Sequence, residues 1–279
     1  MILSSMTTTK KSDSHPEPDP AVPLPGAEVL LDDENDRGIS HFFKREDWWA
    51  AAITFELATF AFFHHMAPEV TLQDSGELVT GAFNFGVPHP PGYPLWAFLG
   101  YLWSHAIIPF GNPAWRIGLM SVFTGGLVVG VMTLMMTRST RVLLHALPWS
   151  QAIEERLLHF IALTVGVSTG LLFGFNRGVW LWACVSEMRV LNVFSFVLMG
   201  CTFFGWMIQP QRKGFLYATL LIFGLSITNH QTVTVMAGAL VVGTLAQGID
   251  RFFSQYRALP ADERPNLFNL LMTSLTTFC

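Results

Sequence analysis

The sequence has few charged residues. Asp, Glu, Lys and Arg make up only 13% of its 279 residues, whereas hydrophobic residues make up 51%. A soluble domain carries about 25% charged residues, so this composition, with a mean hydropathy of +0.41, excludes an ordinary soluble protein. It predicts a polytopic membrane protein whose surface contacts the lipid bilayer.

The sequence also has few cysteines and no motif for nucleotides or nucleic acids. Its three cysteines, Cys184, Cys201 and Cys279, lie far apart, which excludes a disulfide framework. It has no Gly-rich phosphate loop, no zinc-like spacing of Cys and His, and no basic patch. We therefore expect no nucleic-acid partner and no structural metal.

The two ends of the chain differ from its middle. Residues 1–46 are rich in proline and acids and have no helical period, so they predict a disordered cytoplasmic tail. Residues 47–279 predict a transmembrane domain. Its last apolar run begins at Leu267 and stops within the run at Cys279, so we expect this domain to continue in a longer protein.

Long apolar runs predict an all-α bundle of membrane-spanning helices. A helix needs about 20 mostly apolar residues to cross about 30 Å of hydrocarbon. The runs that qualify are residues 48–66, 117–136, 157–175 and 188–208. The run 215–246 is too long for one pass and is interrupted at residues 228–231, so it predicts two short helices that meet at a polar turn. Glu56 lies within the first run, either protonated and hydrogen-bonded or facing a cavity.

Residues 93–109 are an ambiguous apolar segment. Only 14 residues separate Pro94 from Pro109, which gives about 21 Å of helix. If this segment lies in the interface, the basic residues fall on one side, which the positive-inside rule assigns to the cytoplasm. That set is Lys44, Arg45, Arg138, Arg141, Arg156, Arg212, Lys213, Arg251, Arg257 and Arg264. We therefore predict an interfacial helix, and an outer position for residues 67–115, 176–187 and 229–230.

The first outer loop carries acids but no lysine or arginine before Arg116. In "DSGE", Asp74 is placed to cap a helix, and Glu77 is placed to reach back to the capping residue's amide. An acid fixed at such a helix start can also act as a general base. The prolines of "PHPPGYP", residues 88–94, predict a stiff strap that aims His89 and Tyr93.

Further polar residues occur at the same predicted depth. Charges near a membrane span are costly, so Glu187 and Arg189 either pair with each other or face a wet cavity or another partner. Asn229 and His230 interrupt an apolar run, as a hydrogen-bonded kink or as part of a site. Arg116 either extends to the interface or holds an anion. Together these residues predict a site for a sugar phosphate, with a carboxylate that activates an acceptor hydroxyl and cations or a metal that hold the phosphate.

Three blocks of the sequence resemble a known family. "DSGELVTGAFNFGVPHPPGYPLW" resembles the signature of bacterial multipass proteins of a domain-of-unknown-function family. That family is related to the animal endoplasmic-reticulum O-mannosyltransferase that modifies plexin-type IPT domains. "WACVSEMRVLNVFSF" and "FGLSITNHQTV" are similar to its second and third blocks, and the resemblance extends over residues 48–246.

The resemblance implies a glycosyltransferase of the GT-C fold with interfacial helices in its first outer loop. It implies a polyprenyl-phosphate-linked sugar donor, such as a mannose donor, and a protein or glycan acceptor. Asp74 matches the essential acid of the first outer loop, with Glu77 nearby, and Glu187 matches a second acid. The implied location is a bacterial inner membrane with the site on the periplasmic side. The loop has no DxD motif, which leaves a divalent metal cofactor open.

Two rival functions remain at this stage. In a transporter or lipid flippase, the broken helix at residues 229–230 would be the substrate site, but the sequence shows no internal repeat. A non-catalytic scaffold would leave the acidic loop and its proline strap without a role.

Overall fold

The computed structural model describes residues 42–71, 74–107 and 110–258, and within these ranges it contains helices and no strand. In chain order the elements are α2 (Arg45–His65), α3 (Ser75–Phe83), α4 (Pro94–Leu102), the π-helix η1 (Trp103–Ile107), α5 (Pro113–Ala146), η2 (Pro148–Ala152), α6 (Glu155–Gly174), α7 (Arg177–Ala183), α8 (Arg189–Ile208), α9 (Lys213–Asn229), η3 (Gln231–Thr234) and α10 (Val235–Ala258). The chain divides into two compact units, residues 24–247 and residues 1–23 with 248–279.

Four segments are long and apolar enough to cross a membrane: Pro113–Ala146, Glu155–Gly174, Arg189–Ile208 and Gln231–Ile249. They confirm the predicted all-α membrane fold. The predicted break at residues 228–231 is also confirmed, because α9 ends at Asn229 and α10 begins at Val235. However, α10 has 24 residues and is not the short helix that was expected.

Helix α2 forms where the first span was predicted, at residues 48–66, but it is not among these four segments. Its tryptophans, its histidines and Glu56 make α2 less apolar than those four segments. Glu56 is exposed on the surface of the helix. Residues 1–41 of the predicted tail lie outside the described residues. The apolar run that begins at Leu267 lies outside them too. Phe42 is described, and only 5% of it is exposed.

Helix α5 forms the centre of the bundle, and 72% of its most apolar stretch is buried. Helix α6 approaches it closely through glycines spaced four residues apart. A Cβ atom at Gly166 would collide with the Thr137 hydroxyl, and one at Gly170 would collide with the Thr133 hydroxyl. Small residues therefore allow the two helices to pack backbone to backbone, which is typical of helix pairs in membranes.

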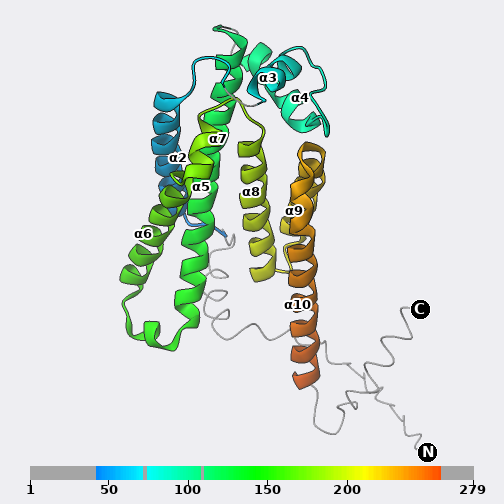
Figure 1. The fold of residues 1–279 in the computed structure, drawn as a ribbon. Coiled ribbons are helices and arrows are strands. Elements are labelled where there is room, and N and C mark those ends of the chain that lie inside the picture. The colour runs from blue at the N-terminus through cyan, green and yellow to red at the C-terminus, as the bar shows by residue number, and fades with distance from the viewer. Residues whose placement is uncertain (1–41, 72–73, 108–109, 259–279) are drawn as a thin grey trace, which may run out of the picture. The chain divides into compact units, whose positions relative to one another are not determined.

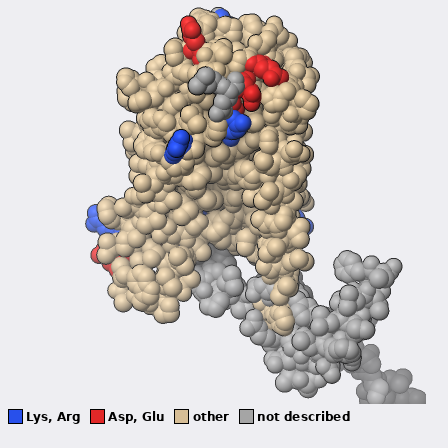
Figure 2. Space-filling view, in the orientation of Figure 1, with Lys and Arg blue, Asp and Glu red and all other residues tan. Residues whose placement is uncertain are grey.

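Helices α3 and α4 lie together at one end of the bundle, beside the start of α5 (Figure 1). This position agrees with the prediction that residues 93–109 do not cross, since α4 and η1 have only nine and five residues. Figure 2 shows charged side chains gathered at this end, next to a broad band without charge. The side of the membrane that this end faces remains a prediction.

The predicted cytoplasmic cations Arg138 and Arg141 take part in packing. Arg141 donates to both carboxylate oxygens of Asp47, at 2.6 and 3.1 Å, and both side chains are buried. The Arg138 guanidinium lies 4.9 Å from the ring centroid of Phe42. These contacts join α5 to α2 and to the residues that precede it.

Candidate functional site

The strap between α3 and α4 holds His89 and Tyr93 in fixed positions. The Gly92 amide donates to the His89 carbonyl at 2.9 Å, which closes a turn. Gly92 and Tyr93 have φ angles of 88° and 45°, values that glycine adopts readily and tyrosine only rarely. The Tyr93 ring is buried in a cluster that includes Leu78 and Trp96. The surrounding packing therefore fixes a backbone conformation that Tyr93 would otherwise avoid.

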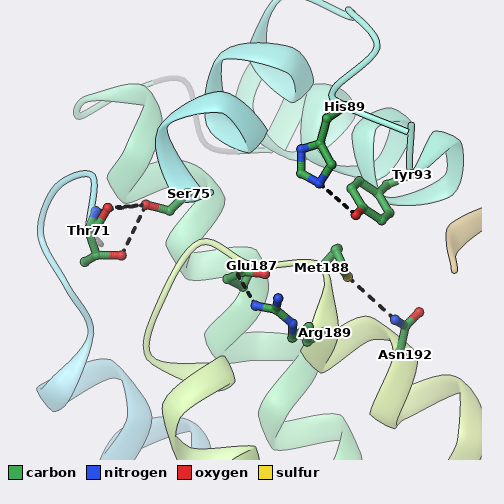
Figure 3. Close-up of polar contacts among 8 residues, drawn as sticks. All are labelled: Thr71, Ser75, His89, Tyr93, Glu187, Met188, Arg189 and Asn192. Carbon is green, nitrogen blue, oxygen red and sulfur yellow. Dashed lines mark hydrogen bonds and ion pairs between the residues drawn. The ribbon is translucent and has the colours of Figure 1, made fainter. Parts of the chain in front are cut away.

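Glu77, His89 and Tyr93 form a hydrogen-bonded chain. The Glu77 carboxylate accepts from the His89 backbone amide at 2.5 Å and pairs with His89 Nδ1 at 3.0 Å. His89 Nε2 lies 3.1 Å from the Tyr93 hydroxyl (Figure 3). The hydrogen bonds from His89 lower the pKa of Glu77, so the Glu77 carboxylate is an acceptor. In the neutral form of His89, this acceptor requires the imidazole proton on Nδ1. Nε2 then accepts from the Tyr93 hydroxyl.

The predicted capping box at the start of α3 is wrong. Asp74 occupies the N-cap position, but its side chain makes no capping hydrogen bond. Glu77 bonds to His89 because the strap folds back over α3 and offers it two donors, where the capping residue would offer one. The turn before α3 is instead closed by Ser75, whose hydroxyl accepts from the Thr71 amide and donates to the Thr71 carbonyl, both at 2.9 Å.

Glu187 is buried at the start of α8. Its Oε1 accepts from Arg189 Nη1 at 3.1 Å, whereas Oε2 has no hydrogen-bond partner within the described residues. The Arg189 guanidinium lies 4.3 Å from the centre of the Trp182 ring. Burial raises the pKa of Glu187; Arg189 opposes this increase and Asp74 adds to it. The predicted pair is therefore observed, but it leaves one carboxylate oxygen without a partner in a buried place.

Charged groups from three segments are close enough to Tyr93 to shift its pKa. Burial raises the pKa of Tyr93; nearby Arg189 lowers it, and Asp74, Glu187 and Glu77 raise it. In Figure 3, His89 and Tyr93 stand opposite Glu187 and Arg189. The start of α3, the strap and the segment between α7 and α8 thus meet at one place. Such a site offers carboxylates, a phenol and a guanidinium to a polar ligand.

Asn229 and His230 reach this place in different ways. Asn229 is fully buried; its Nδ2 donates to Asn192 Oδ1 at 2.6 Å, and its Oδ1 accepts from the Trp96 amide at 3.2 Å. It therefore connects α9 to α8 and α4. The His230 ring accepts from the Thr232 amide at 3.1 Å and caps η3.

His230 also lies beside Tyr93. Their rings are parallel, with centroids 6.0 Å apart. The hydrogen-bonded kink that was predicted as one alternative is observed, and His230 also borders the site through Tyr93.

Arg116 contacts the loop before α5. Its Nε donates to the carbonyls of Phe110 and Gly111 at 3.1 and 3.0 Å, and its Nη1 donates to the Ser104 carbonyl at 3.0 Å. The guanidinium also lies 5.9 Å from the centre of the Phe83 ring. Arg116 therefore holds this loop beside α3, and its role in phosphate binding remains a prediction.

Two residues of the site were not foreseen. Trp182 supports Arg189, and Asn192 fixes Asn229. An amide near the start of an apolar helix was a usable signal for Asn192, because a buried amide needs a partner. Nothing in the sequence around Trp182 distinguishes it from other interfacial tryptophans.

The structure gives no candidate metal centre in the part of the chain that it describes. No group of three or more His, Cys, Asp or Glu side chains is placed there to hold a metal ion.

Comparisons with known proteins identify the family. The profile named "Protein O-mannosyl-transferase TMEM260 N-terminal domain" matches residues 74–250. A protein O-mannosyl-transferase tmem260 from Dictyostelium discoideum is 52% identical over 62 residues, which cover 22% of this chain and 7% of that protein. Protein O-mannosyl-transferase TMEM260 from Mus musculus is 30% identical over 165 residues, which cover 58% of this chain and 20% of that protein.

This chain therefore matches no more than a fifth of the length of either relative. No solved structure matches. The matched region contains the strap, the Glu187–Arg189 pair and the α9–α10 break, and it covers more than half of the sequence. The chain belongs to the family of the protein O-mannosyl-transferase TMEM260 N-terminal domain.

Proposed function

We propose that this chain forms the donor site of a membrane glycosyltransferase. The enzyme moves a sugar, such as mannose, from a polyprenyl-phosphate donor to a hydroxyl of a protein or glycan acceptor. The observation that carries the proposal is the meeting of Asp74, the Glu77–His89–Tyr93 chain and the Glu187–Arg189 pair around one buried phenol. This site lies at the end of the bundle, next to the uncharged band that suits a lipid tail. The names of both relatives support transfer of mannose to protein.

The arrangement of helices also supports the GT-C type. In the proposal, α3 and α4 are the interfacial helices of the first outer loop, and the site faces the outer or lumenal side. The positive-inside rule supports this orientation. In a bacterium the site would face the periplasm across the inner membrane.

Asp74 is the proposed general base. Its carboxylate is exposed, makes no capping bond, and lies near Tyr93 and Glu187. It takes the proton of the acceptor hydroxyl as that oxygen bonds to the anomeric carbon. The bond from the anomeric carbon to the phosphate oxygen breaks, and polyprenyl phosphate leaves with the electron pair. Asp74 then releases the proton to solvent.

The remaining residues bind the donor in this proposal. The Arg189 guanidinium, which is close enough to lower the pKa of Tyr93, is suited to a phosphate oxygen, with Arg116 and His230 as further phosphate contacts. Buried Glu187 Oε2 accepts a hydrogen bond from a sugar hydroxyl. Glu77, His89 and Tyr93 shape the opposite wall, and Asn229 fixes the α9 end of the site.

The test uses the full protein in reconstituted vesicles with polyprenyl-phosphate mannose labelled in the sugar. We expect label to move into protein or glycan and polyprenyl phosphate to be released in equal amount. A protein with Asp74→Asn should bind the lipid but transfer little label. If the intact lipid crosses the vesicle membrane and no label is transferred, the protein is a flippase and the proposal fails.

A further inference from the structure

The Glu77–His89–Tyr93 chain connects solvent with the buried side of the site. The side chains of Glu77 and His89 are 51% and 37% exposed, whereas Tyr93 is 4% exposed. General base catalysis by Asp74 does not require an exposed acid–histidine pair behind a buried phenol. The direction of the hydrogen bonds in this chain suggests what the pair does.

The chain has two hydrogen-bonding states. When His89 is neutral, Nδ1–H donates to Glu77, and Nε2 accepts the Tyr93 hydroxyl at 3.1 Å. The Tyr93 oxygen then offers only lone pairs to a ligand. When His89 takes up a proton, Nε2–H donates to the Tyr93 oxygen. The phenolic hydrogen is thereby released and can donate to a ligand.

The charges around the chain determine which state is favoured. Glu77 contacts His89 directly and stabilises its cation, and Asp74 and Glu187 add negative charge around Tyr93. Arg189 opposes them, and the His230 ring lies against Tyr93. A phosphate diester bound beside Tyr93 would add one further negative charge. Donor binding and proton uptake by His89 should therefore favour each other.

We propose that Glu77, His89 and Tyr93 form a positioning relay in which proton uptake by His89 turns the Tyr93 hydroxyl into a hydrogen-bond donor to a phosphate oxygen of the lipid-linked donor. The relay rests on the proposed function and adds a phosphate ligand to it. Tyr93 touches the phosphate, whereas Glu77 and His89 act through Tyr93. No proton is transferred to or from the sugar.

The sign of the pH dependence follows from this arrangement. The state that binds phosphate is the one in which His89 carries the extra proton, so affinity is highest at low pH and decreases as pH rises. One linked proton changes the dissociation constant by at most about tenfold per pH unit. Within that limit, we expect the Kd to be about tenfold higher at pH 8 than at pH 6.

The test measures the Kd of the full protein in nanodiscs for polyprenyl-phosphate mannose, whose phosphate diester keeps a single negative charge from pH 5.5 to 8.5. Tyr93→Phe and His89→Gln should weaken binding at pH 6 and leave a Kd that hardly changes with pH. Glu77→Gln should keep the pH dependence but move its midpoint to lower pH. Tyr101→Phe is the matched control, because it removes another phenol of this region; its profile should match that of the wild type.

Thermal denaturation separates the relay from a purely structural role. If Tyr93→Phe and Glu77→Gln lower the Tm and weaken binding equally at every pH, the three residues only hold the strap and the relay is wrong. If the wild type transfers sugar but its Kd does not change with pH, the relay fails and the proposed function stands. If the wild type does not bind this lipid, both fail.

Discussion

The Glu77 carboxylate accepts hydrogen bonds from both the backbone amide and the imidazole of His89, twelve residues further along the chain. This one contact fixes the strap over α3 and turns Glu77 away from the helix start that precedes it. As a result, the two acids of "DSGE" have separate roles. Glu77 supports the strap, and Asp74 remains available for chemistry.

The proposed phosphate contacts of Arg116 and His230 can be tested by measuring donor binding. We predict that Arg116→Lys weakens binding of polyprenyl-phosphate mannose, because lysine keeps the charge but lacks the planar guanidinium that binds phosphate through two hydrogen bonds. His230→Ala should weaken it as well, since His230 lies against Tyr93. The measurement is the Kd for the lipid.

The matched control for these variants is Arg177→Lys, because Arg177 is an exposed arginine at the start of α7. Arg116 also donates to three backbone carbonyls, so the substitution can affect folding. The Tm of Arg116→Lys should therefore be measured together with its Kd. A Kd equal to that of the wild type in both Arg116→Lys and His230→Ala would remove these residues from the site.

Membrane topology can be tested by cysteine labelling in a variant without its native cysteines. We predict that a cysteine at Thr140, near the Arg138–Arg141 end of α5, does not react with an impermeant thiol reagent added from outside. A cysteine at Glu69, an exposed position before α3, should react. Efficient labelling of Thr140→Cys from outside would contradict the interfacial position of residues 93–109 and move the site to the cytoplasmic side.

The buried Asp47–Arg141 pair gives a prediction about stability. Removing one partner of a buried pair leaves an uncompensated charge and costs about 3–5 kcal/mol. Asp47→Ala should therefore lower the free energy of unfolding by roughly that amount, and the double variant Asp47→Leu with Arg141→Met should recover most of the loss. The measurement is denaturant unfolding in detergent.

Glu56→Ala is the control for Asp47→Ala, because Glu56 lies on the same helix but is exposed. It should change stability much less. If Asp47→Ala is as stable as the wild type, the 2.6 Å contact contributes little to the fold.

The fold was more predictable than the contacts of the site. Apolar length located α5, α6 and α8, because a bilayer imposes a minimum length on any helix that crosses it. The polar break at Asn229 and His230 was visible for the same reason. The prediction that α4 lies in the interface rests on charge, since the short length of this segment alone did not decide the question.

The pairing of residues within the site could not be read from the sequence. The capping rule considers residues three positions apart, and it assigned Glu77 to the wrong partner because a non-local strap supplied better donors. Asp47 and Arg141 are separated by 94 positions, and only the packing of α2 on α5 brings them together. Sequence patterns thus identified which residues are polar and where they lie, whereas tertiary contacts determined their partners.

Asp74→Asn separates catalysis from helix capping. Asparagine caps a helix as well as aspartate does, and Asp74 makes no capping bond here, so the variant should fold, insert and bind donor normally. It cannot take the proton of the acceptor hydroxyl, a contribution of about 10²–10⁴-fold in rate. We therefore expect a loss of that size in transfer of labelled sugar, with little change in Tm. Glu69→Gln is the matched control, because it neutralises another exposed acid of the same loop and should keep full activity. If Asp74→Asn turns over at nearly the wild-type rate, Asp74 is not the base. The role would then pass to Glu77 or to Glu187, whose buried Oε2 has no hydrogen-bond partner within the described residues.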